Sequence, residues 1–223
     1  MTARVQVKVC GLTTPEDARA VAEAGADAIG LVFWAQSPRA VDVETARRIA
    51  AALPPFVARV GVFVDASRDE LRRVAEAVPL DLVQLHGHEP LEALEGLPRR
   101  AIKALGVGAD FDLEQARRYA ERADALLLDT GGQARPGGSG RAFDWAIARA
   151  LRARVPRLIL AGGLTPDNVA AAITAVRPDA ADVSSGVESS PGRKDAAKVR
   201  AFIEAVRAVA LESAAQARKQ AER

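Results

Sequence analysis

The sequence predicts an α/β protein folded as a single (β/α)8 barrel, the TIM-barrel fold. Its 223 residues, 49% of them hydrophobic, match the usual length of one such barrel and supply a sizeable core. Eight short runs rich in Val, Ile and Leu alternate with helical patterns, an order that requires parallel strands joined by crossover helices. No Gly/Ser-rich linker divides these units, so we expect one domain.

The eight predicted strands recur at intervals of about 25 residues, the space that one strand and its following helix occupy in this fold. Each run is short and is bounded by Gly, Pro or polar residues, as is typical of strands. The runs begin near residues 5, 27, 57, 80, 100, 124, 157 and 180.

The helices between the strands begin with N-cap or first-turn signals. Thr14, Ser67 and Thr165 each stand ahead of Pro or acidic residues, which favour the first turn of a helix. We assign residues 1–210 to the barrel. Residues 211–223 are Ala-rich and charged without an apolar stripe, and they predict a helical C-terminal extension to which we assign no function.

Charge and cysteine content limit the classes of function. The 31 Lys and Arg residues and the 29 Asp and Glu residues give a formal net charge of +2. This surplus is too small to indicate binding to nucleic acid or to an anionic membrane. The single cysteine excludes an intrachain disulfide, and no apolar run reaches the roughly 18 residues that span a bilayer. We expect a cytoplasmic protein that binds a small molecule, with neither nucleic-acid nor membrane partners. The sequence leaves monomer and homodimer open.

The first predicted strand gathers reactive groups on one face. Side chains of a strand alternate between two sides, so Val5, Val7 and Val9 would face the helices while Lys8 and Cys10 would face the barrel interior. Cys10 would then lie at the carboxyl end of its strand, where active sites of this fold are found.

Cys10 is a candidate base or nucleophile, because Gly11 lets the backbone turn and leaves the sulfur at the barrel mouth. The alternative is a small buried side chain without reactivity. Lys8 on the same face would favour the thiolate, or would instead pair with an acidic residue such as Asp129 or Asp182.

Two other strand ends carry charged side chains. Asp129 follows three leucines at the end of the sixth strand. Apolar neighbours disfavour the ionised carboxylate, so Asp129 is a candidate proton donor. The alternative is that Asp129 caps the next loop. Arg39 follows the second strand, and its guanidinium suits a planar carboxylate, although an ordinary exposed arginine is, taken alone, the commoner case.

Small residues fill the loops after the seventh and eighth strands. Gly162 and Gly163 follow the former, and Ser185 and Gly186 follow the latter. In this fold the backbone N–H groups of these two loops commonly bind phosphate, while plain turns are the alternative.

Three further predictions concern a lid, a histidine and metals. Gly137, Gly138 and Gly140 predict a lid after the sixth strand, with a plain loop as the alternative. His86 ends the fourth strand as either a ligand contact or a structural hydrogen-bonding group. With two histidines and one cysteine there is no metal-ligand spacing, and we expect no metal.

As an ordered set, the motifs between residues 5 and 207 resemble those of phosphoribosylanthranilate isomerases. The resemblance implies a barrel of the ribulose-phosphate-binding type and a step of tryptophan biosynthesis. That step is the Amadori rearrangement of N-(5-phosphoribosyl)anthranilate to 1-(2-carboxyphenylamino)-1-deoxyribulose 5-phosphate, which needs no cofactor. The motifs are KVCGLT, GLVFWAQSPRAV, GVFVD, QLHG, LLLDT, GGSGRAFDW, LAGGLTPDNV and DVSSGVESSPGRKD.

The resemblance also implies roles for individual residues. Asp129 would be the acid that protonates the ribose ring oxygen, and Cys10 would be the base that removes the proton from C2. Arg39 would hold the anthranilate carboxylate, and the seventh and eighth loops would hold the phosphate. Possible further substrate contacts are Lys8, His86 and Asp182.

Two alternative functions are compatible with a phosphate-binding barrel. Another phosphate-binding barrel, such as indole-glycerol-phosphate synthase or an aldose isomerase of histidine biosynthesis, resembles the fold, but KVCG after the first strand argues against it. A non-catalytic barrel that binds a phosphoribosyl ligand would keep the phosphate loops, and the joint presence of Cys10 and Asp129 disfavours it.

Overall fold

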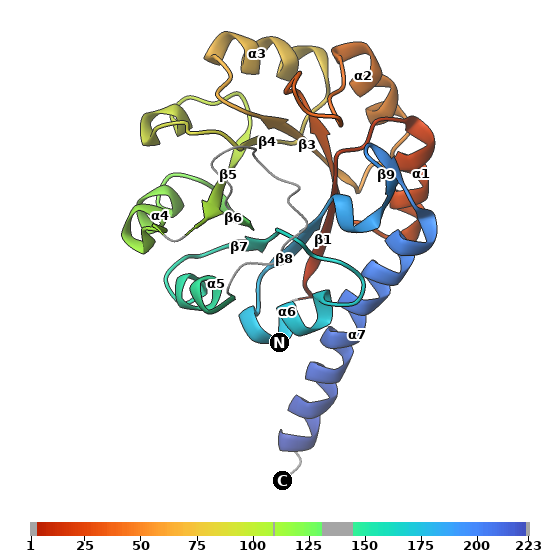
Figure 1. Ribbon diagram of the computed structural model, residues 1–223, viewed down its shortest axis with the longest axis vertical. Helices are drawn as coiled ribbons and strands as arrows, with labels where there is room; N and C mark the ends of the chain where they lie inside the picture. The colour runs from red at the N-terminus through yellow and green to blue at the C-terminus, as the bar shows by residue number, and fades with distance from the viewer. Residues whose placement is uncertain (1–3, 109, 131–144, 222–223) are drawn as a thin grey trace.

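The computed structural model describes residues 4–108, 110–130 and 145–221, and side chains as far as residue 209. Eight parallel strands form a closed barrel in which β8 pairs with β1 (Figure 1). Every strand begins within two residues of its predicted start, so the (β/α)8 prediction is confirmed. The strands are β1 Gln6–Cys10, β2 Ala28–Val32, β3 Ala58–Phe63, β4 Leu82–Leu85, β5 Arg100–Val107, β6 Ala125–Thr130, β7 Leu158–Leu160 and β8 Ala180–Val183.

Helices surround the barrel on its outer side (Figure 1). In the described residues, one connection departs from the strand–helix alternation, because only the short 3-10 helix η1 links β4 to β5. Pro90 precedes η1, and Gly96 follows it with a left-handed φ of 62°, so the chain turns before a longer helix forms. The helices are α1 Pro15–Ala24, α2 Val43–Ala51, α3 Arg68–Ala77, η1 Leu91–Leu94, α4 Leu113–Ala120, α5 Trp145–Arg152, α6 Val169–Val176 and α7 Ala196–Ala221.

Two of the three predicted helix starts are confirmed. The side chains of Thr14 and Ser67 each accept a hydrogen bond from the backbone N–H three residues later. The prediction for Thr165 is wrong, because α6 begins only at Val169. The side-chain oxygen of Asn168 accepts from the backbone N–H of Thr165 (2.8 Å), and this bond closes a turn ahead of the helix.

The last helix continues past the predicted barrel boundary. Helix α7 runs without a break to Ala221, so the helical extension expected from residue 211 belongs to the same helix as the barrel-covering part. Its blue C-terminal end projects beyond the barrel in Figure 1. No helix in the described part of the chain combines the length and apolarity needed to cross a membrane.

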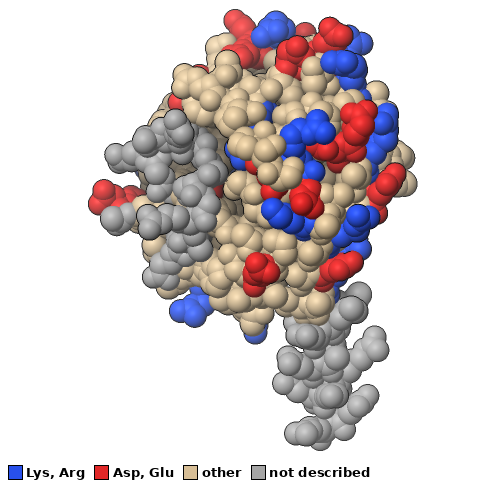
Figure 2. All heavy atoms as spheres, turned by 45° about the vertical axis from the view of Figure 1, so that its right-hand side comes forward, with Lys and Arg blue, Asp and Glu red and all other residues tan. Residues whose placement is uncertain are grey.

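The hydrophobic core has an outer and an inner layer. Val7 and Val9 of β1 belong to the outer layer, between the strands and the helices, as the alternation predicted. Val60 and Leu127 belong to the inner layer, which fills the barrel itself. On the surface, acidic and basic side chains are interspersed over the face that Figure 2 shows.

Candidate active site

Cys10 lies at the carboxyl end of β1, with 9% of the residue exposed. Its neighbour on β2 is Gly30, where an added Cβ would lie 2.6 Å from the Cys10 sulfur. Gly11 has a φ of +78°, and an added Cβ there would lie 2.5 Å from Cδ of Arg39. Both glycines therefore make room for the side chains at this barrel mouth, and the turn expected at Gly11 is present.

An ion pair lies beside the thiol in the barrel interior. Nζ of Lys8 is 2.9 Å from Oδ1 of Asp182, and both side chains are buried. Burial lowers the pKa of Lys8, but attraction to Asp182 and Cys10 outweighs it, so the pKa of Lys8 is raised. Burial raises the pKa of Asp182 despite Lys8. Of the partners that the sequence left open for Lys8, the structure selects Asp182.

These charges also act on the thiol. Burial raises the pKa of Cys10, and the charge of Asp182 raises it further. The cations of Lys8 and Lys194 oppose that rise without cancelling it. The free protein therefore favours the protonated thiol, and the charges of Lys8 and Lys194 favour the thiolate.

Asp129 lies at the end of β6 and is 6% exposed. Its Oδ1 accepts a hydrogen bond from the backbone N–H of Thr130 (2.7 Å). Its Oδ2 lies 3.4 Å from Nε2 of His86, whose Nδ1 is 2.9 Å from Nε2 of Gln84. The structure thus places His86 between Asp129 and a fully buried glutamine at the end of β4.

Arg39 is held by a carboxylate from the segment after β8. Its Nε and Nη2 donate to Oε1 and Oε2 of Glu188 over 2.8 and 2.7 Å. The Arg39 side chain is 16% exposed, so the interpretation as an ordinary exposed arginine is wrong. The hydroxyl of Ser37 accepts a hydrogen bond from the backbone N–H of Arg39 (3.1 Å) and so fixes the backbone that leads into Arg39.

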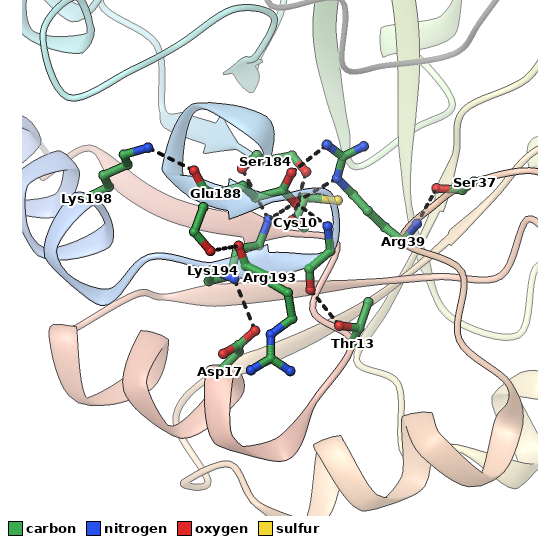
Figure 3. Close-up of polar contacts among 12 residues, drawn as sticks. Cys10, Thr13, Asp17, Ser37, Arg39, Ser184, Glu188, Arg193, Lys194 and Lys198 are labelled. Carbon is green, nitrogen blue, oxygen red and sulfur yellow. Dashed lines mark hydrogen bonds and ion pairs between the residues drawn. The ribbon is translucent and has the colours of Figure 1, made fainter.

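Glu188 and Lys194 are site residues that were not predicted from the sequence. They lie on two short antiparallel strands, β9 Glu188–Ser190 and β10 Arg193–Lys194. Nζ of Lys194 donates to Oε1 of Glu188 (2.8 Å) and to the carbonyl of Ser184 (3.2 Å), while the Ser184 hydroxyl donates to the carbonyl of Cys10 (3.0 Å). Figure 3 shows this group around Cys10. The Pro-Gly turn between Glu188 and Lys194 was the available signal for a hairpin.

The loops after β7 and β8 pack against each other. Gly162 and Gly163 both have left-handed φ values, 81° and 65°. An added Cβ at Gly186 would lie 2.0 Å from the carbonyl oxygen of Leu164, so only glycine fits there. Ser185 and Gly186 open the 3-10 helix η2 (Ser185–Val187), and N–H groups at a helix start have no partner within the helix.

The predicted lid and the predicted lack of a metal site concern other parts of the chain. The lid glycines Gly137, Gly138 and Gly140 lie in segment 131–144, outside the described residues. Among the residues that the structure does describe, no group of three or more His, Cys, Asp or Glu side chains is arranged to hold a metal ion.

A thiol, a carboxyl group and glycine-rich loops therefore lie at the carboxyl ends of strands in one closed barrel. These features are those of a (β/α)8-barrel enzyme whose strand ends carry a thiol and a carboxyl group, two side chains able to transfer protons. The family model for N-(5'-phosphoribosyl)anthranilate (PRA) isomerase matches residues 7–205, and the chain belongs to this family.

Individual relatives agree with the family assignment. The chain is 57% identical over 208 residues to an N-(5'-phosphoribosyl)anthranilate isomerase of Pseudomonas fluorescens, covering 91% of this chain and 96% of that protein. The solved phosphoribosyl anthranilate isomerase of Thermotoga maritima superposes with a TM-score of 0.85 at 46% identity, covering 91% and 98% of the two chains. Another solved isomerase contains reduced 1-(o-carboxyphenylamino)-1-deoxyribulose 5-phosphate, with a TM-score of 0.82, 46% identity and the same coverage.

Proposed function

We propose that this protein converts N-(5-phosphoribosyl)anthranilate to 1-(2-carboxyphenylamino)-1-deoxyribulose 5-phosphate, the isomerase step of tryptophan biosynthesis. The observation that carries this proposal is the joint placement of the Cys10 thiol and the Asp129 carboxyl group at the strand ends of one barrel, in a member of the isomerase family. The reaction is an internal redox rearrangement of one sugar. It therefore requires an acid and a base but no external oxidant or reductant.

Asp129 acts first, as the acid. Its carboxyl group gives a proton to the ribose ring oxygen while the bond from that oxygen to C1 breaks. The lone pair of the anthranilate nitrogen moves to C1 and forms a protonated imine. His86, 3.4 Å from Asp129, is placed to orient the carboxyl group for this transfer.

Cys10 acts second, as the base. Its thiolate takes the proton from C2, and the electrons of that C–H bond form a C1–C2 double bond as the imine nitrogen becomes neutral. The resulting enolamine gains a proton at C1 and loses the proton of its 2-hydroxyl group to give the ketone. Asp129 ends as a carboxylate and Cys10 as a thiol, so proton exchange with solvent resets the pair.

The remaining candidate residues bind the substrate. The guanidinium of Arg39 holds the anthranilate carboxylate, and backbone N–H groups in the loops of Gly163 and Ser185 hold the phosphate. Lys8 pairs with Asp182, and the charge of Lys8 also supports the Cys10 thiolate against the opposing charge of Asp182. The partner is thus a small phosphoribosyl compound, and a reducing cytoplasm keeps the single thiol available.

Complementation of a tryptophan auxotroph that lacks this step tests the proposal. The intact gene should restore growth, and purified protein should convert the substrate without added metal or cofactor. Cys10→Ala and Asp129→Asn should not restore growth although both proteins accumulate. Growth with either variant would remove that residue from the proposed mechanism.

A non-catalytic phosphoribosyl-binding barrel predicts a different result. Such a protein would bind the reduced product analogue but would neither complement nor turn over substrate. A different phosphate-barrel isomerase would fail with this substrate and convert a phosphoribosyl substrate that lacks the anthranilate group.

A further inference from the structure

Glu188 occupies a position between two cations at the barrel mouth. It is 8% exposed, and its Oε1 accepts from Nε of Arg39 and from Nζ of Lys194, both over 2.8 Å. Its Oε2 accepts from Nη2 of Arg39 over 2.7 Å. The backbone N–H of Gly192 gives Oε1 a third donor at 3.3 Å. A buried carboxylate with this many donors is fixed in position, and its pKa is lowered because hydrogen bonds from Arg39 and Lys194 outweigh burial.

The contact to Glu188 uses only one edge of the Arg39 guanidinium. A guanidinium can receive a carboxylate on the edge formed by Nε and one Nη, or on the edge formed by both Nη atoms. Glu188 takes the first edge. Within the described part of the chain Nη1 of Arg39 donates no hydrogen bond, and Figure 3 shows one terminal nitrogen of Arg39 directed away from Glu188. A second carboxylate therefore has an open edge to bind.

The charges of the cluster also permit a second carboxylate. Arg39 and Lys194 are two cations, and Glu188 is one anion, so their formal charges sum to +1. An Arg39–Glu188 pair without Lys194 would be neutral and would attract a substrate carboxylate less. Lys194 thus compensates the anion that holds Arg39.

We propose that Glu188, anchored by Lys194, is a positioning residue that fixes the guanidinium plane of Arg39 and presents its outer edge to the carboxylate of the substrate. This inference rests on the proposed function, in which Arg39 binds the anthranilate carboxylate. Glu188 itself touches no substrate. Its effect is on selectivity, because a fixed guanidinium favours ligands with a planar carboxylate over otherwise identical ligands without one.

The test compares two product analogues. One is reduced 1-(o-carboxyphenylamino)-1-deoxyribulose 5-phosphate, and the other is the same compound with a plain phenylamino group. Glu188→Gln keeps the side-chain shape but replaces one acceptor oxygen by a donor that opposes Arg39. It should weaken binding of the first analogue by about tenfold or more and change binding of the second less than about twofold. A merely structural role would weaken both alike, and that result would overturn the inference.

Arg39→Lys, measured in parallel, separates this inference from the proposed function. Loss of the carboxylate preference in Arg39→Lys together with its retention in Glu188→Gln would overturn only the role of Glu188. Retention of the preference in Arg39→Lys would refute the proposed role of Arg39, and the inference would fail with it.

Two more variants complete the design. Glu121→Gln removes an exposed carboxylate that pairs with Arg117 at the end of α4, and it should leave both affinities unchanged. If Glu188→Gln does not fold, as judged by its thermal unfolding, Glu188→Asp serves instead. The shorter side chain cannot span Arg39 and Lys194 together, so the carboxylate preference should fall, and an unchanged preference would contradict the inference.

Discussion

Lys8 and Asp182 face each other across the seam between β1 and β8, with 2.9 Å between Nζ and Oδ1. The two residues are 174 positions apart in the sequence, and barrel closure alone makes them neighbours. Their charges act on Cys10 with opposite signs. Lys8 lowers the pKa of the thiol and Asp182 raises it, with the effect of Lys8 being the larger.

Removing Lys8 should therefore raise the pKa of Cys10 further. In Lys8→Met the thiolate loses the cation with the largest effect on it, so less thiolate forms at a given pH whether the remaining Asp182 is charged or protonated. The rate at which iodoacetamide alkylates Cys10 is measured as a function of pH. The midpoint of its rise should lie at a higher pH in Lys8→Met than in the unchanged protein. Arg72→Met, which removes an exposed charge from α3, should leave this profile in place.

Lys8→Met also leaves a buried carboxylate unpaired, which costs stability. The double variant Lys8→Met/Asp182→Asn removes both charges and avoids that penalty. Because Lys8 has the larger effect on the thiol, the double variant should still shift the profile to higher pH. A shift to lower pH in the double variant would contradict this account of the electrostatics.

The pH dependence of turnover follows from the same thiol. Burial raises the pKa of Cys10 above its ordinary value, so the thiolate fraction increases through and beyond the neutral range. Because Asp129 must be protonated for the same reaction, the unchanged enzyme reports both groups, and the test uses Asp129→Asn. In that variant Cys10 is the remaining member of the proposed acid–base pair, so the residual kcat/KM should rise with pH over that interval and fall as the pH is lowered. A flat profile of this variant between pH 6 and 9 would exclude the Cys10 thiolate as the reacting base.

Cys10→Ala should lower kcat by at least about a hundredfold, because general-base contributions usually lie between 10²-fold and 10⁴-fold. The substitution removes one sulfur from a small apolar group formed with Val32 and Val62, so the fold should persist. Circular dichroism checks the fold and steady-state kinetics check the rate. Near-normal turnover of the folded variant would end the assignment of Cys10 as the base.

Asp129→Asn should separate binding from chemistry. Asparagine keeps the shape and can still accept from the N–H of Thr130, but it has no proton to transfer to the ring oxygen. The reduced product analogue should bind nearly as well as before, while kcat falls by about a hundredfold or more. A parallel loss of binding and turnover would point to a structural role. Retained turnover would show that another group protonates the ring.

Adding a negative charge tests the phosphate loops. Ser185→Asp places a carboxylate beside the N–H groups that open η2, where it would repel a phosphate. Inorganic phosphate should then inhibit at least about tenfold more weakly. Ser190→Asp adds the same charge at an exposed position on β9 and should leave inhibition unchanged. Equal effects at the two sites would place phosphate elsewhere. Ser185 is the position to change in this loop, because a Cβ at the neighbouring Gly186 would collide with the Leu164 carbonyl.

The order of elements and several candidate residues follow from the sequence alone. Strand starts are encoded locally, by apolar runs between turn residues, and alternation along β1 correctly placed Val7 outside and Cys10 inside the barrel. Gly11 was predictable for the same reason, because a backbone turn after a strand has a local signature. These features depend on neighbours within a few positions, and such information is present in a single sequence.

The partners of the charged groups were decided by tertiary structure. Arg39 pairs with Glu188, which is 149 positions away. Nothing in the sequence distinguishes Glu188 as its partner from the many other carboxylates. Lys8 likewise pairs with Asp182 rather than Asp129, because β8 and not β6 closes the barrel against β1. Coulomb interactions fall with distance and are screened by water, so which pairs form depends on which strand ends the closed barrel brings together and buries.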